Sequence, residues 1–208
     1  MTGRRITVAI SGASGAAYAL QLVRTLLAAD CRVELVLSAA ARQVLKLEQQ
    51  LDWSGELPQL QRQVQQFFAV DAERLRCYAN DDFCAPCASG SNCAAAMVIV
   101  PASMGCVARV AAGISANVIE RAADVMLKER KPLVLVPRET PLNAIHLENL
   151  LSLTRAGAVV LPAMPAFYGR AQRVEDLIDF IVGKICDVIG VPHQLLQRWG
   201  EENHECHE

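Results

Sequence analysis

Two residues suited to chemistry, Arg138 and Glu139, follow directly on an apolar run at 133–136. Such a run is typical of a strand buried on both faces, so the charged pair should lie at the strand's carboxyl end. The arginine can hold a phosphate through two parallel hydrogen bonds, and the carboxylate can exchange protons with a reacting group. Pro137 and Pro141 restrict the loop, which suits a preorganised site better than an ordinary surface ion pair.

Four more apolar runs end in small or polar residues, at 11–15, Ser38, 101–105 and 162–168. The first of these segments, "SGASG", leads into a helix, whose N-terminus favours an anion. Its spacing matches neither the dinucleotide fingerprint nor the Walker sequence, so a mononucleotide site and a tight structural turn both remain open. Because the carboxyl ends of parallel strands share one edge of a sheet, the five segments predict a single site there.

Two cations, Arg121 and Lys128, lie seven residues apart on the polar side of a predicted helix. Asn117 can cap this helix, with Glu120 in the capping-box position. From spacing alone, a solvated face with an Asp124–Lys128 pair is the preferred interpretation of either cation.

A third cation, Lys184, follows Leu177 by seven residues and Phe180 by four, which places it on an apolar helical stripe. A lysine there must reach water or meet an anion, and periodicity leaves both alternatives open. Tyr168 follows "PAMPAF" at the end of the last predicted strand, where either packing or a functional hydroxyl is possible.

The elements that position these residues alternate between strand and helix from the start of the chain. This order predicts a parallel sheet with right-handed crossovers, and therefore an α/β protein. The expected strands are 4–10, 31–37, 95–103, 133–136 and 158–164. The expected helices are 16–29, 38–48, 59–68, 117–130, 142–157 (ending at Gly157) and 174–190.

Length, composition and charge predict the number of domains, the kinds of partner and the location of the protein. The 208 residues, 52% of them apolar, predict one domain over 1–208, with a C-terminal tail at about 190–208. A net charge of −2 gives no reason to expect nucleic acid or an acidic membrane surface as a partner. No apolar run is long enough to span a membrane, and no signal peptide is recognisable, so a cytoplasmic location is expected.

Eight cysteines raise the question of disulfides or metal. Several lie in apolar segments of a chain without a secretion signal, so reduced thiols are expected. Cys84, Cys87 and Cys93 resemble half of a zinc site that His204, Cys206 and His207 could complete. The second group lacks ligand-pair spacing, so no metal site is predicted.

Long motifs carry a resemblance to one family. "AISGASGAAYALQLVRTL", "ERAADVMLKERKPLVLVPRETPL", "HLENL", "GAVVLPAMPAFY" and "VEDLIDFIVGKI" closely resemble the UbiX-type flavin prenyltransferases, over about residues 5 to 200. The resemblance implies a three-layer Rossmann-like (flavodoxin-like) parallel sheet with helices on both faces. It also implies a homododecamer whose flavin site lies between subunits.

The implied reaction is a metal-independent transfer of a dimethylallyl group from dimethylallyl monophosphate to reduced FMN. The group is joined to N5 and C6 of the flavin, and a UbiD-type decarboxylase receives the prenylated FMN. That decarboxylase would act in ubiquinone biosynthesis or in aromatic acid decarboxylation. A diphosphate or a longer prenyl donor remains an alternative.

Residue roles follow from the same resemblance, motif by motif. The implied FMN contacts are Gly12, Ala13, Ser14, Ser38, Ala102, Ser103, Met104, Gly105, Arg121 and Arg138, with 88–91 nearby. The implied phosphate site of the donor contains Lys128, Arg138, Tyr168, Lys184 and Glu48. Ser14 should lie near the reacting N5, and Glu139 is the expected proton carrier. Lys184 stands where the family often has arginine, so a difference in phosphate affinity is expected.

Three other functions are alternatives. Flavin-dependent cysteine decarboxylases use an early histidine and a "PASANT"-like motif, whereas this chain has no histidine before His146 and reads "PASMGCVA". A non-catalytic FMN-binding or electron-transfer protein would not need converging cations beside the flavin. A structural subunit of a decarboxylase complex would co-purify with the decarboxylase and show no turnover.

Overall fold

The computed structural model describes residues 3–167 and 171–196. Six parallel strands form one sheet in the order β3-β2-β1-β4-β5-β6. Their bounds are β1 Arg5–Ile10, β2 Arg32–Leu37, β3 Leu75–Tyr78, β4 Ala96–Ala102, β5 Leu133–Pro137 and β6 Val159–Val160. This is the order of doubly wound Rossmann sheets, so the expected α/β class and parallel sheet are confirmed.

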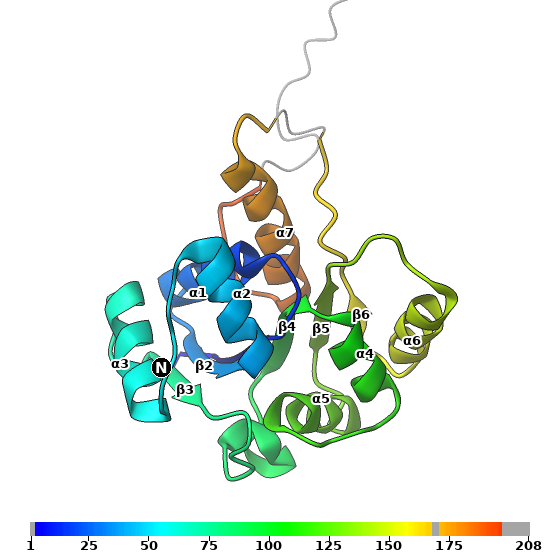
Figure 1. Cartoon of the computed structure of the whole chain (residues 1–208), viewed down its shortest axis with the longest axis horizontal. Coiled ribbons are helices and arrows are strands. Elements are labelled where there is room, and N and C mark those ends of the chain that lie inside the picture. Colours follow the sequence, from blue (N-terminus) through cyan, green and yellow to red (C-terminus); the bar gives the residue numbers. More distant parts are fainter. Residues whose placement is uncertain (1–2, 168–170, 197–208) are drawn as a thin grey trace, which may run out of the picture.

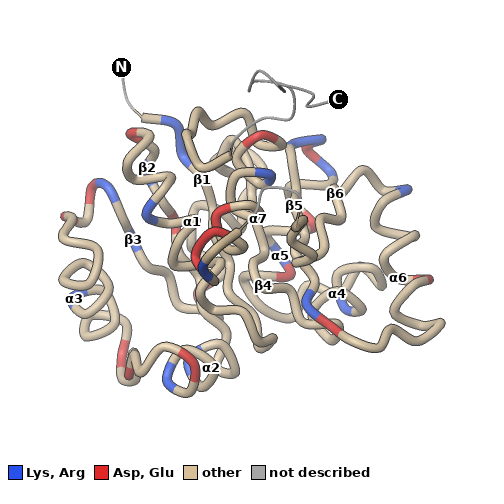
Figure 2. Tube along the Cα trace, turned by 90° about the horizontal axis from the view of Figure 1, so that it is seen from above, with Lys and Arg blue, Asp and Glu red and all other residues tan. Residues whose placement is uncertain are grey.

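Helices cover both faces of the sheet and make three layers (Figure 1). The first face packs against α1 Ala16–Ala28, α2 Ala39–Gln49, α3 Leu57–Phe68 and α7 Val174–Ile189. The second packs against α4 Met104–Ala111, α5 Val118–Lys128 and α6 Ala144–Arg155. Two short 3-10 turns, η1 Pro86–Ala88 and η2 Gly90–Asn92, lie beside α5 on the second face. Seen from above, α3 and α6 stand at opposite ends of the sheet (Figure 2).

The alternation of apolar residues along each strand explains the two cores. In β1, Ile6, Val8 and Ile10 bury on the first face, and Ala9 buries on the second. β4 is buried along its whole length, which accounts for its continuous apolar sequence. The chain therefore has apolar layers on both sides of the central strands, which holds their carboxyl ends in place.

The observed elements differ from the predicted ones in several places. Strand β3 and helix α4 were not predicted, and β6 is shorter than the expected strand at 158–164. Gly157 does end α6, with the positive φ of 102° that favours glycine. Asn117 caps α5 as expected, since its Oδ1 accepts from the Glu120 N–H at 3.1 Å. The Glu120 side chain, however, does not accept from the Asn117 backbone N–H, so the capping box is not formed.

Candidate functional site

The carboxyl ends of β1 and β4 are tied together by one buried serine. The Ser11 hydroxyl donates to the Pro101 carbonyl at 2.8 Å and accepts from the Ser103 N–H at 2.7 Å. Beyond these ends the chain turns to opposite faces of the sheet, toward α1 and toward α4. A crevice at such a divergence is the usual ligand site of a doubly wound sheet.

The loop after β1 approaches its neighbours closely. A Cβ on Gly12 would lie 2.5 Å from the Ala40 Cβ, so only glycine fits beside α2. Gly15, at the N-cap of α1, has a φ of 111°, which also favours glycine. Local packing accounts for both glycines, while Gly12 and Ser14 of the "GASG" loop are exposed at the crevice.

Two serines cap the helices that begin at this edge. Ser38 Oγ accepts from the Ala41 N–H at 3.0 Å at the start of α2, and Ser103 Oγ accepts from the Cys106 N–H at 3.4 Å at the start of α4. Between them lies a pocket of about 150 Å³. Its lining residues are Ser11, Gly12, Ser38, Ala40, Asn80, Ser103, Cys106, Arg109, Asn117, Ile119 and Glu120. The structure thus brings together Gly12, Ser38 and Ser103, as predicted.

A second cluster lies at the outer side of the same loop. Arg138 Nε donates to the Ser14 carbonyl at 3.3 Å. The Glu48 carboxylate accepts from the Gly15 and Ala16 N–H groups, each at 2.9 Å. Burial raises the pKa of the Glu48 carboxyl, but hydrogen bonds from the Ser14 hydroxyl and the two N–H groups, with the nearby guanidinium, lower it overall. Glu48 is therefore an anion fixed beside the cation of Arg138.

Glu139 stands next to this cluster and is exposed. Its Oε1 accepts from the Thr140 N–H at 3.1 Å. A carboxylate that is exposed and only locally bonded is free to meet a reacting group. The prediction that Arg138 and Glu139 lie where β5 ends is confirmed.

A third group of predicted residues lies along the outer side of α5. Arg121 donates from Nε to the Ala88 carbonyl at 3.3 Å and pairs with Asp124 at 2.9 Å. Lys128 pairs with Glu129 at 2.6 Å, so the expected Asp124–Lys128 pair is wrong. A Cβ on Gly90 would lie 2.7 Å from Lys128 Nζ, which places the 88–91 segment directly against both cations.

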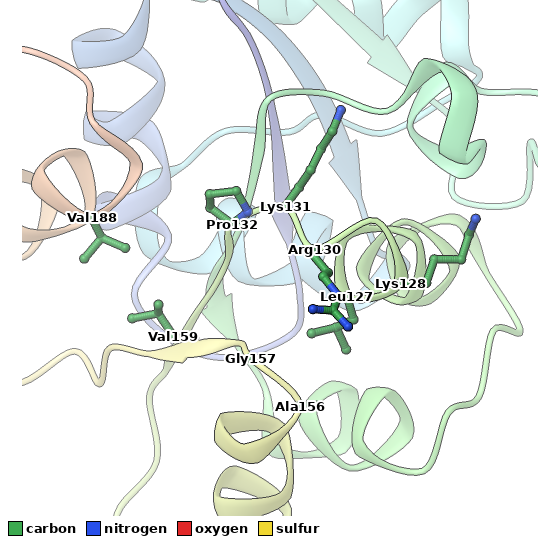
Figure 3. A pocket seen from close by; sticks show the side chains of 9 residues that line it. All are labelled: Leu127, Lys128, Arg130, Lys131, Pro132, Ala156, Gly157, Val159 and Val188. Carbon is green, nitrogen blue, oxygen red and sulfur yellow. The ribbon is translucent and has the colours of Figure 1, made fainter.

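Lys128 and Arg138 lie at opposite edges of the sheet. Lys128 ends α5 before β5 begins, and Arg138 follows β5, a five-residue strand that spans about 17 Å. At the amino edge, Lys128 lines a hollow of about 740 Å³ together with Arg130, Lys131 and residues of β6 and α7 (Figure 3). One chain therefore does not bring Lys128 to Arg138.

Lys184 is placed differently from the prediction. The buried stripe of α7 contains Ile181, Val182 and Ile185, whereas Lys184 is exposed and follows the half-buried Phe180. The apolar stripe expected for Lys184 is thus only its partly exposed margin. Tyr168 lies outside the described residues.

Within residues 3–167 and 171–196, no group of three His, Cys, Asp or Glu side chains could hold a metal ion, and no helix could cross a membrane. The described cysteines are free: Cys31, Cys77, Cys84, Cys87, Cys93, Cys106 and Cys186. His204, Cys206 and His207 lie outside the described residues. Burial raises the pKa of the Cys87 thiol to about 12.

The two charged residues of this pocket lining were not recognised as site residues in the sequence. Arg109 was not singled out, and Glu120 was expected only as a helix cap. They pair across the pocket, eleven positions apart in different helices. No local spacing rule connects such positions, so only the fold reveals them.

Comparisons with known proteins agree with this geometry. The model of the family described as Flavoprotein matches residues 1–186. The flavin prenyltransferase UbiX of Pseudomonas aeruginosa is 46% identical over 96% of this chain and 95% of its own length. The flavin prenyltransferase UbiX of Alkalihalophilus pseudofirmus is 48% identical, over 94% of this chain and 96% of its own length.

Two solved structures share the fold along nearly the whole chain. AnUbiX (PadA1), in complex with FMN and dimethylallyl pyrophosphate, has a TM-score of 0.83 and 40% identity, and the match covers 95% of this chain and 97% of that one. A dodecameric FMN-dependent UbiX-like decarboxylase from Escherichia coli O157:H7 has a TM-score of 0.82 and 35% identity, and the match covers 94% of this chain and 98% of that one.

Proposed function

The chain belongs to the UbiX-type flavin prenyltransferases within the Flavoprotein family, and from this we propose how its residues perform prenyl transfer to FMN. The enzyme joins a dimethylallyl group to N5 and C6 of reduced FMN and releases prenylated FMN. One observation carries the assignment of the site. Arg138 is held against Ser14 at the crevice, where the leaving phosphate of a prenyl donor would need a cation.

The residues at the carboxyl edge fit a flavin mononucleotide. Gly12, Ala13, Ser14 and Ser38 present small side chains and backbone N–H groups, and Ser103 of the 102–105 segment lines the same pocket as Gly12 and Ser38. Bound there, FMN supplies the nucleophilic nitrogen and the ring carbon of the reaction. The residues of this chain bind it, orient it and exclude water from it.

The donor phosphate is bound by Arg138 with Lys184, Tyr168 and Lys128, and Glu48 fixes the orientation of the arginine. Dimethylallyl monophosphate is the proposed donor. When the allylic C–O bond breaks, the electron pair leaves with the phosphate, and cations neutralise the charge that develops. Formation of the bond at C6 requires one proton to leave the ring and one to reach the prenyl alkene. Glu139 or the released phosphate carries these protons.

A second copy of the chain completes the site. Arg121, Lys128 and the 88–91 segment lie along α5, away from Arg138, and a copy docked against the crevice would supply them in trans. A homo-oligomer such as a dodecamer can complete the site in this way, because each interface can place the α5 helix of one chain against the crevice of its neighbour. The dodecameric UbiX-like relative supports this arrangement.

The product serves a UbiD-type decarboxylase, and the cytoplasm is the proposed location. Prenylated FMN is a cofactor rather than an end product, so an enzyme that uses it must receive it. The pathway is ubiquinone biosynthesis or aromatic acid decarboxylation.

An anaerobic single-turnover experiment tests the proposal. Purified protein is mixed with reduced FMN and dimethylallyl monophosphate, and the extracted flavin is analysed by mass spectrometry and absorbance. A flavin heavier by one isoprenyl unit is expected. Tightly bound but unmodified flavin, with the monophosphate and the diphosphate alike, would contradict the transferase assignment and favour a non-catalytic flavoprotein.

A further inference from the structure

The small pocket between α2 and α4 has the properties of an anion site. Its volume of about 150 Å³ is well below the roughly 300 Å³ at which sites for drug-sized ligands begin, so a tricyclic ring does not fit inside. A phosphate group does. The pocket is also continuous with the "GASG" loop through Gly12, so a ligand can extend from it toward Ser14.

Two helices begin at the pocket. Ser38 and Ser103 each use their hydroxyl to accept one N–H group, that of Ala41 and that of Cys106. The first N–H groups of α2 and α4 are therefore left pointing toward the carboxyl edge, as at any helix start. Both helix N-termini favour negative charge at this point.

Arg109 supplies a full positive charge to the same pocket. It lies in α4, and its Nε donates to a carboxylate oxygen of Glu120. A Cβ on Gly105 would lie 3.5 Å from Arg109 Nη1, so the guanidinium folds back along α4 toward the helix N-terminus. Of its five N–H donors, only the one on Nε has a partner among the described residues. Four donors on the two Nη atoms remain for a ligand.

Glu120 holds the guanidinium in position. Its side chain is completely buried, and its Oε2 accepts from the Ala116 N–H at 3.0 Å while Oε1 accepts from Arg109. With both oxygens bonded, this carboxylate cannot rotate freely. The arginine is therefore anchored on one side and open on the side that faces the pocket.

We propose that Arg109 binds the phosphate group of FMN in this pocket, between the N-termini of α2 and α4. Two anions are then separated within the site, the flavin phosphate at Arg109 and the donor phosphate at Arg138. The inference rests on the proposed function, because it takes FMN as the ligand. It goes further by assigning a flavin role to a residue that no sequence motif indicated.

Riboflavin, which lacks the phosphate, provides the test. Binding of FMN and of riboflavin is measured by fluorescence quenching for the wild type, Arg109→Gln and Arg109→Lys. Arg109→Gln should weaken FMN binding about ten- to a hundredfold and leave riboflavin binding unchanged, as for the loss of hydrogen bonds to a charged group. The FMN affinity of Arg109→Lys should lie between those of the wild type and Arg109→Gln, because lysine keeps the positive charge but loses the planar fork of donors. Arg155→Gln, an exposed arginine of α6, is the matched control.

Other outcomes separate the alternatives. Equal losses for FMN and riboflavin, or no loss for either, would overturn the role of Arg109. If Arg109→Gln alone does not fold, Arg109→Gln/Glu120→Gln removes the unpaired buried charge and should show the same selective loss of FMN. Prenyl transfer at saturating FMN is measured separately. A wild type that binds FMN with the predicted selectivity but transfers no prenyl group would refute the transferase function and leave this inference intact.

Discussion

Proton transfer in the proposed reaction is assigned to a single exposed carboxylate, Glu139. It lies beside Arg138 at the end of β5, and among the described residues its carboxylate is bonded only to the Thr140 N–H. Its position could be read from the sequence, because an apolar run that ends in an Arg–Glu pair between two prolines marks a strand end with fixed geometry. The pairing of Arg109 with Glu120 could not, since it depends on the packing of α4 against α5.

Glu139→Gln tests this assignment at the scale of one residue. The amide keeps the size and polarity of the side chain but cannot exchange a proton, so prenylated FMN formation should slow about a hundred- to ten-thousandfold. The measurement is the anaerobic rate of product formation, with Glu148→Gln on α6 as the exposed control. Full activity of Glu139→Gln would remove Glu139 from the mechanism and leave the released phosphate as proton carrier.

At the scale of elements, helix α5 shows which contacts a capping pattern predicts correctly and which it does not. The Asn-x-x-Glu spacing predicted the start of α5, and Asn117 caps it. The glutamate was assigned the wrong partner, because its buried carboxylate accepts from the Arg109 guanidinium and the Ala116 N–H, and not from the backbone N–H of the cap. A tertiary ion pair outweighs a local capping box.

The ionised Glu120 should therefore stabilise the α4–α5 connection. Burial raises the pKa of its carboxyl, but hydrogen bonds from Arg109, Asn117 and Ala116 lower it overall from the ordinary 4.5. A group whose pKa is lower in the folded state adds stability above its unfolded pKa and loses it as the pH falls through the folded value. This contribution should thus be complete near neutral pH and decline below about pH 4.5.

Glu120→Gln measures that contribution. The variant should lose about 1–3 kcal/mol of unfolding free energy at about pH 7, as for hydrogen bonds to a charged group. Urea denaturation at several pH values should show the gap to the wild type narrowing below about pH 4.5. Exposed Glu148→Gln should show no such gap. A difference that stays constant with pH would mean that packing, and not the charge, stabilises the connection.

The elements that escaped prediction, β3 and α4, each lack a local sequence signal. Strand β3 is a four-residue edge strand that contains the exposed Arg76, so it lacks the apolar run that identifies the central strands. Helix α4 starts one residue after β4 ends, with only Ser103 between them, so no loop composition marks the change. Long amphipathic helices such as α5 and α7 were predictable, because their apolar spacing extends over three turns or more.

At the scale of the whole molecule, the predicted site residues fall into two sets. The crevice set, with Ser14 and Arg138, lies at the carboxyl edge, whereas Lys128 lies at the amino edge. Two helices also carry exposed apolar side chains. These are Ile145, Leu147 and Leu151 on α6 and Val174 and Val188 on α7, all at least 39% exposed. In the proposed homo-oligomer, contacts with neighbouring copies would bury the exposed apolar side chains of these two helices.

A site shared between subunits predicts complementation. Arg138→Ala and Lys128→Ala should each abolish most prenyl transfer, because each removes one cation from the proposed phosphate site. When equal amounts of the two variant chains are co-assembled, about a quarter of the sites should receive a wild-type Arg138 from one subunit and a wild-type Lys128 from its neighbour. Activity should then recover toward about a quarter of the wild-type rate.

Arg138→Ala mixed with Glu139→Gln is the matched control, because both residues follow β5 of the same chain and enter the same crevice. If one chain supplies both residues to each site, no mixture of these two variants assembles a site with both intact, and activity should stay low. Recovery in the control would mean that one chain does not supply both Arg138 and Glu139 to a site. No recovery in the Arg138→Ala and Lys128→Ala mixture despite proven co-assembly would mean that Lys128 does not act across the interface. Any role of Lys128 would then lie in the amino-edge hollow of its own chain and not in the phosphate site.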